Sequence, residues 1–112
     1  MNITIQRALL AIEAMVPLMQ AAGLSADAQR GLCRLWKSLG DARDSFLLAD
    51  AQLAAEYADT EERGRRRAAL LADEVDIDPV RIPDEPPIWA ASTPIVIFRL
   101  EGLLLIGEEG AA

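Results

Sequence analysis

The chain has 112 residues, of which 52% are hydrophobic and 26% are charged, and its 18 acidic and 11 basic residues give a net charge of −7. This composition is typical of a folded protein, and the length predicts a single domain spanning residues 1–112. The negative charge disfavours nucleic acid as a partner. The sequence contains no histidine, which removes the usual general base near neutral pH and the commonest ligand of transition metals.

The first predicted helix spans residues 4–22. Its apolar residues recur at the spacing of a helical stripe, and they are Ile5, Ala8, Leu9, Ile12, Met15, Val16 and Met19. Thr4 is the expected N-cap, whereas Leu10 and Leu18 lie off the stripe. Because polar side chains are scarce around this helix, we expect it to lie at the centre of the fold or at an interface.

Two further helices are predicted before residue 59. The second helix covers residues 26–39, with Ser25 as its cap and Gly40 as its end. Asp41 is expected to cap a third helix over residues 42–58, which is rich in alanine.

A fourth helical segment covers residues 60–72. It is either a separate helix capped by Thr60 or a continuation of the third helix, and the sequence leaves both open. The segment contains a basic cluster of four residues, Arg63, Arg65, Arg66 and Arg67. The cluster has the charge to hold a phosphate, an acidic peptide or RNA. Since no aromatic residues interleave the arginines, we interpret it as a solvated helix face paired with Glu61, Glu62 and the acidic segment at residues 73–87.

Residues 73–87 are acidic and rich in proline, and they are predicted to form an extended connector. The apolar residues of this connector allow short edge-strand pairing, and they are Val75, Ile77, Val80 and Ile82. Asp76 and Asp78 have the spacing that begins a calcium-binding loop. Pro79 interrupts that pattern, and the loop glycine and the terminal glutamate are missing, so we expect no metal site and no cofactor.

Residues 88–107 are predicted to form a β hairpin with strands at 95–100 and 103–106. Gly102 is expected to adopt a positive φ in a three-residue loop, with a two-residue loop as the alternative. Residues 108–112 are expected to be a flexible tail. The predicted fold class is α+β: an N-terminal bundle of three to four helices in residues 1–72, an acidic connector, and a C-terminal β hairpin.

Both faces of the predicted hairpin are apolar, with Arg99 as the one charge in its strands. Either the helices and the connector cover both faces, or one face binds a second chain, and we favour the second interpretation. The residues predicted at this interface are Trp89, Ile95, Ile97, Phe98, Leu103, Leu104, Leu105 and Ile106. Expected partners are a second copy of the chain, a basic protein, or both.

The sequence around Ser45 resembles a known motif. Asp44-Ser45-Phe46, predicted at the start of the third helix of an acidic chain, is similar to the Asp-Ser-Leu motif of acyl carrier proteins. Leu39-Gly40 and Ile82-Pro83-Asp84-Glu85 add to the resemblance, although both stand at other distances from Ser45 than in that family. The resemblance implies a phosphopantetheine arm on Ser45. The alternative interpretation is an ordinary serine in the first turn of a helix.

Cellular location is predicted from three features. Cys33, the only cysteine, borders an apolar stripe, and we expect it to be buried in a reducing, cytoplasmic environment. Glu13 interrupts the apolar N-terminal segment, so we expect no targeting signal. Residues 94–107 are too short and too charged to span a membrane, and we expect no membrane partner.

These observations predict a non-catalytic protein–protein interaction module, such as an assembly or adaptor subunit, a chaperone, or an inhibitor of a larger machine. It would act through the apolar hairpin and the first helix. Two alternatives stay open: a carrier protein modified at Ser45, and an acidic mimic of nucleic acid that regulates a DNA-binding enzyme.

Overall fold

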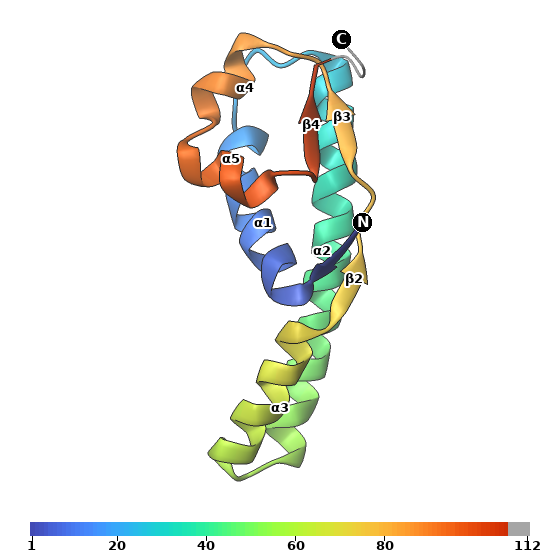
Figure 1. The fold of residues 1–112 in the computed structure, drawn as a ribbon, viewed down its shortest axis with the longest axis vertical. Coiled ribbons are helices and arrows are strands. Elements are labelled where there is room, and N and C mark those ends of the chain that lie inside the picture. The colour runs from blue at the N-terminus through green and yellow to red at the C-terminus, as the bar shows by residue number, and fades with distance from the viewer. Residues whose placement is uncertain (108–112) are drawn as a thin grey trace.

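The computed structural model describes residues 1–107, so the predicted flexible tail at 108–112 lies outside the described residues. The described part is mostly helical, with five helices and four short strands in two small sheets (Figure 1). The predicted combination of helices with a smaller β component is therefore confirmed. The arrangement of the C-terminal third differs from the prediction.

Helix α1 (Ile5–Met19) forms where the apolar stripe predicted it, although it ends three residues earlier than expected. Thr4 is its N-cap, and the Oγ1 atom of Thr4 accepts a hydrogen bond from the backbone N–H of Arg7 at 3.1 Å. Six residues of α1 are buried, namely Ala8, Ala11, Ile12, Ala14, Met15 and Leu18. The helix packs against both α2 and α5, which confirms its predicted central position.

Helix α2 (Ala26–Glu56) is one continuous helix, so the predicted break at Gly40 and the predicted cap at Asp41 are wrong. The buried residues Leu39 and Ala42 flank Gly40. A Cβ atom on Gly40 would lie 3.8 Å from Cδ1 of Ile12, which places α1 directly against this turn. Packing on both sides of the glycine thus outweighs its low helix propensity of about 1 kcal/mol.

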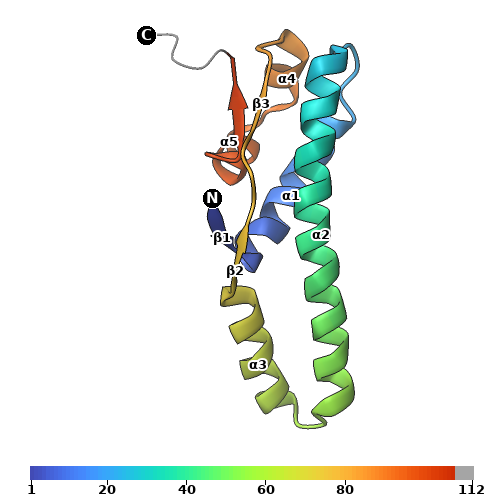
Figure 2. The same ribbon diagram turned by 90° about the vertical axis from the view of Figure 1, so that its right-hand side faces the viewer.

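Helix α3 (Thr60–Ala72) is separate from α2, which decides between the two alternatives for this segment. Its N-cap is Asp59 rather than Thr60, because Oδ1 of Asp59 accepts a hydrogen bond from the N–H of Glu61 at 3.0 Å. The helix runs back along the C-terminal half of α2, and the two helices project from the rest of the protein as an arm (Figures 1 and 2).

The acidic connector supplies two short strands, as its apolar residues predicted. Strand β2 (Glu74–Asp76) pairs antiparallel with β1 (Asn2–Thr4). Strand β3 (Val80–Ile82) pairs in parallel with β4 (Leu104–Ile106). In Figure 2, α2 occupies one side of the molecule and the strands occupy the other.

The predicted C-terminal hairpin is wrong. Residues 86–100 form two short helices, α4 (Pro86–Ala91) and α5 (Pro94–Leu100), and each begins with a proline in its first turn, where a missing N–H is tolerated. Val96 and Leu100, four residues apart, turn into the core together. Only the second predicted strand is present, as β4, and its partner is the connector strand β3. Gly102 has the expected positive φ, at 77°.

The hydrophobic core is built from the N-terminal half of α2, from α1, and from the C-terminal elements. Its largest fully buried side chains are Met15, Leu18, Leu32, Leu35, Leu39, Ile77, Ile82, Ile88 and Leu103. Strand β3 lies directly on α2, where a Cβ atom added to Gly31 would be 3.5 Å from the carbonyl oxygen of Arg81.

Candidate interaction surface

The predicted interface residues separate into three groups in the structure. Leu103 is fully buried in the core and is not available to a partner. Leu104, Leu105 and Ile106 form β4 and are half-buried. Trp89 on α4 and Ile95, Ile97 and Phe98 on α5 are exposed.

Helix α5 is apolar around its whole circumference apart from Arg99. Val96 and Leu100 face the core, so Ile95, Ile97 and Phe98 face outwards. Phe98 is 75% exposed, and Ile95 is 56% exposed. Exposed apolar side chains in such a group mark an interaction surface in soluble proteins.

Phe98 stands between two hollows in the surface. On one side lies a hollow of about 660 Å³, which we call the β4 groove, and its apolar walls include Trp89, Ile97, Leu104, Leu105 and Ile106. On the other side lies a hollow of about 470 Å³, lined by Met1, Leu10 and Arg99 among others. We call the exposed apolar group formed by Met1, Leu10 and Phe98 at this second hollow, together with Ile95 one helical turn before Phe98, the α5 face.

Two residues of the α5 face, Met1 and Leu10, were not predicted from the sequence. Leu10 carried a usable signal, because it lies off the apolar stripe of α1 and a stripe that faces the core leaves such residues outside. The same signal fails for Leu18, which also lies off the stripe but is buried. Met1 directly precedes β1 and lines the second hollow. Nothing in the residues next to Met1 indicates this position.

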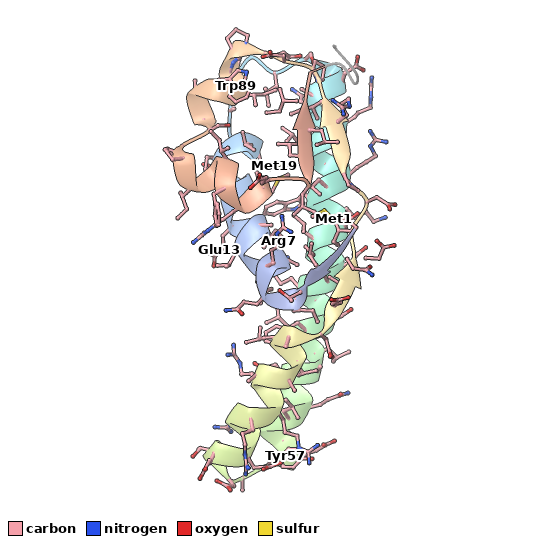
Figure 3. The ribbon with its side chains drawn as sticks, viewed as in Figure 1. Met1, Arg7, Glu13, Met19, Tyr57 and Trp89 are labelled. Carbon is pink, nitrogen blue, oxygen red and sulfur yellow. The ribbon has the colours of Figure 1, made fainter. Side chains whose placement is uncertain are left out.

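The α5 face is bordered by equal numbers of acidic and basic groups. Nη1 of Arg99 lies 3.4 Å from Oε2 of Glu13 on α1. Arg7 donates a hydrogen bond from Nη2 to the carbonyl oxygen of Glu101. Figure 3 shows Met1, Arg7 and Glu13 below α5. The border of two arginines and two glutamates is therefore neutral, although the chain as a whole carries a charge of −7.

Trp89 lines the β4 groove and also forms a hydrogen bond with the acidic connector. Its Nε1 atom donates a hydrogen bond of 2.6 Å to Oδ1 of Asp84, which fixes the indole ring on α4 above α5 (Figure 3). Buried or half-buried tryptophan rings prefer such a partner for their polar atom. The ring thus presents its apolar part to the groove in one orientation.

The other candidate residues lie away from this surface. Ser45 is exposed in the interior of α2, so the helix start on which its resemblance to a carrier motif depended is absent. Cys33 is exposed, and the prediction of its burial is wrong, because β3 covers the neighbouring face of α2 at Gly31.

The arginine cluster lies on the arm, and Arg65, Arg66 and Arg67 form ion pairs. Arg65 and Arg66 pair with Glu62, as the sequence predicted, and Nε of Arg67 lies 3.2 Å from Oδ1 of Asp50 on α2. The guanidinium carbon of Arg66 also lies 4.8 Å from the centre of the Tyr57 ring. The acidic connector is not the partner of Arg65, Arg66 or Arg67.

Two further properties concern the described part of the chain. Among residues 1–107, no three Asp, Glu or Cys side chains gather closely enough to hold a metal ion. No helix in the same range combines the length and the apolar character that crossing a membrane requires.

Comparisons of the chain with models of known protein families, with curated proteins and with solved structures give no match. The chain's own surface is thus the basis for assigning a function.

Proposed function

We propose that this protein is a non-catalytic interaction module that forms a homodimer through the α5 face. The observation that carries the proposal is the exposure of Phe98, which is 75% exposed between two apolar hollows. An aromatic side chain held in this way on a short helix is costly to leave in water and is stabilised by a second apolar surface.

The charges around the α5 face favour a second copy of the chain as the partner. In a twofold dimer the same patch meets itself, so each charge on the border faces the border of the other copy. Arg7 and Arg99 on one copy then have Glu13 and Glu101 on the other as available partners. A border of one sign would repel itself, whereas this neutral border is self-complementary.

The α5 face is also separate from the arm. Leu48, on the C-terminal half of α2, is 65% exposed, and its neighbours one helical turn away include the polar residues Asp44, Ser45 and Gln52. Leu47 is also exposed, but adjacent residues on a helix point in different directions, and exposed leucines are common on protein surfaces. We therefore place the dimer contact at α5 and not at the arm.

The test is the solution mass by light scattering after size exclusion, measured over a range of concentrations for the wild type, Phe98→Glu and Leu48→Glu. The wild type is expected to have twice the mass of one chain. Phe98→Glu is expected to have the mass of one chain with unchanged helical circular dichroism, because it places a charge in the apolar contact. Leu48→Glu is the matched control and should remain a dimer.

A wild type that stays monomeric at the highest concentration would contradict the proposal. So would a dimer that Phe98→Glu leaves intact and Leu48→Glu dissociates, because that result would move the contact to the arm.

A further inference from the structure

The outer edge of β4 carries backbone groups without a partner. Val80 N–H donates to the carbonyl of Leu103 at 2.9 Å, and Gly107 N–H donates to the carbonyl of Ile82 at 3.0 Å. In this parallel ladder, residues 103, 105 and 107 therefore turn their backbone groups towards β3. Leu104 and Ile106 turn theirs to the opposite edge, where no partner for them exists within residues 1–107.

The other edge of this two-stranded sheet is covered. The carbonyl oxygen of Arg81, which points away from β4 in the same ladder, faces α2 beside Gly31. Proteins usually protect a free edge with charged residues, proline or a bulge. The sequence Leu104-Leu105-Ile106 contains none of these, so the edge is left open to a further strand.

The β4 groove lies along this open edge. Its walls are the strand itself, the Trp89 ring, and the Ile97 and Phe98 side chains of α5. Its volume is about 660 Å³. The groove thus offers apolar side-chain contacts directly beside two residues that need backbone hydrogen bonds.

The two ends of the groove carry opposite charges. Arg81 lines the groove and donates from Nη1 to the carbonyl of Gly107 at 2.9 Å, just after the end of β4. Glu101 lines the groove before the start of β4. A guanidinium has further N–H donors when one of them is used, so Arg81 can still bind an acidic group.

We propose that the β4 edge accepts an extended segment of a partner protein as a third strand, antiparallel to β4. In this arrangement Leu104 and Ile106 each exchange both backbone hydrogen bonds with a residue of the segment. The segment has β-branched residues at its centre, an acidic residue at its N-terminal end near Arg81, and a basic residue at its C-terminal end near Glu101. This binding goes beyond the proposed homodimer and uses the β4 edge, although the Phe98 side chain borders both surfaces.

The experiment attaches such a strand to the full chain. The sequence Asp-Val-Thr-Val-Lys follows Ala112 through a flexible Gly/Ser linker, which raises its effective concentration to the order of millimolar. The readout is hydrogen exchange of individual backbone amides by NMR. Leu104 and Ile106 report on the open edge, and Leu105 and Gly107, whose amides already bind β3, are internal controls.

In the chain without the added strand, the Leu104 and Ile106 amides are expected to exchange much faster than those of Leu105 and Gly107. The added strand is expected to slow exchange at Leu104 and Ile106 at least tenfold and to leave the two controls unchanged. A second fusion with the end charges exchanged, Lys-Val-Thr-Val-Asp, is expected to slow amide exchange at Leu104 and Ile106 less than the first fusion does. Unchanged exchange at Leu104 and Ile106 in the first fusion would overturn the proposal.

The same measurement in the Ile95→Glu background separates strand binding from dimerisation, because Ile95 belongs to the α5 face and does not line the groove. Protection that persists in this variant supports an independent strand site, whether or not the homodimer exists. If the Leu104 and Ile106 amides are protected in the wild type without any added strand, and Ile95→Glu removes that protection, a second copy covers the edge and the proposal is overturned.

Discussion

A Cβ atom added to Gly31 would lie 2.5 Å from Cγ2 of Ile82 and 3.1 Å from Cγ1 of Val80. Two side chains of β3 therefore occupy the space that any other residue at position 31 needs. This close approach is what seats β3, and with it the β4 groove, on the N-terminal half of α2.

Gly31→Ala is expected to destabilise the protein. Overpacking against a β-branched side chain costs about 1–3 kcal/mol, against a gain of about 1 kcal/mol from helix propensity. Urea denaturation followed by circular dichroism should show a lower midpoint than the wild type. An equal or higher midpoint would mean that β3 can move away from α2 without lowering the free energy of unfolding.

Gly64→Ala is expected to stabilise the protein, in contrast to Gly31→Ala. Gly64 lies in the middle of α3, and no atom lies within 4 Å of the position its Cβ atom would take. The substitution should raise the free energy of unfolding by about 0.5–1 kcal/mol, because alanine loses less backbone freedom in a helix. The same denaturation experiment measures it, and the pair of variants compares one substitution in two environments.

Ser25 and Glu85 are expected to be energetically coupled. Glu85 accepts hydrogen bonds from the backbone N–H of Ser25, at 2.9 Å, and from its hydroxyl, while Oγ of Ser25 caps α2 by accepting from Ala28 N–H at 3.2 Å. Ser25→Ala should lower stability by about 0.5–2 kcal/mol, and its cycle with Glu85→Ala should show a coupling of about 0.5 kcal/mol or more.

Thr4→Ala provides the control for this cycle. Thr4 caps α1 by accepting from Arg7 N–H, whereas the Glu85 side chain bonds to Ser25. The losses from Thr4→Ala and Glu85→Ala should therefore add within about 0.5 kcal/mol. Equal coupling in both cycles would show that Glu85 acts on overall stability rather than on the Ser25 cap.

Arg67→Ala is expected to loosen the arm, whereas Arg65→Ala is not. Arg67 joins α3 to α2 through Asp50, at 3.2 Å, and its guanidinium carbon lies 5.4 Å from the centre of the Phe46 ring. Arg65 pairs with Glu62 within α3 itself. Arg67→Ala should cost about 1 kcal/mol and speed amide exchange along α3, while Arg65→Ala should cost less than about 0.5 kcal/mol. Equal exchange rates in the two variants would contradict this role.

Local signals in the sequence were reliable where a few neighbouring residues settle the structure. The Thr4 and Ser25 caps bind N–H groups three residues ahead, and Gly102 takes the positive φ expected of a glycine in a tight turn. The apolar stripe predicted α1 itself, although only Ala8, Ile12 and Met15 of its seven residues are buried and Val16 and Met19 are exposed. Each of these features depends on contacts within about one helical turn, which the sequence displays directly.

The same local signals failed at Gly40 and in the C-terminal apolar run. A glycine followed by an aspartate has the pattern of a helix end and a new cap, yet α1 packs against Gly40 and α2 continues. Apart from Arg99, residues 95–100 are apolar and mainly β-branched or aromatic, a pattern compatible with a strand or a short buried helix. The helix forms because Val96 and Leu100 reach the core together from one side.

The candidate surface was predicted in part. Trp89, Ile95, Ile97 and Phe98 are exposed, as residues at an interface need to be, whereas Leu103 is fully buried. The open edge of β4 was not predicted, because β4 pairs along its other edge with β3, a strand far away in the chain. The pairing of Leu104 with Val80 joins residues that the sequence separates by two helices, and no local pattern indicates it.

The sequence by itself determined the apolar stripe of α1, the helix caps, the short connector strands, and the excess of apolar residues near the C-terminus. These properties follow from side-chain chemistry and short-range periodicity. Only the tertiary structure decided that the apolar run divides into α5 and β4, and that Phe98 faces outwards while Leu103 faces inwards. The reason is that an apolar residue has no preferred direction of its own, and the elements that pack against it decide which side is buried.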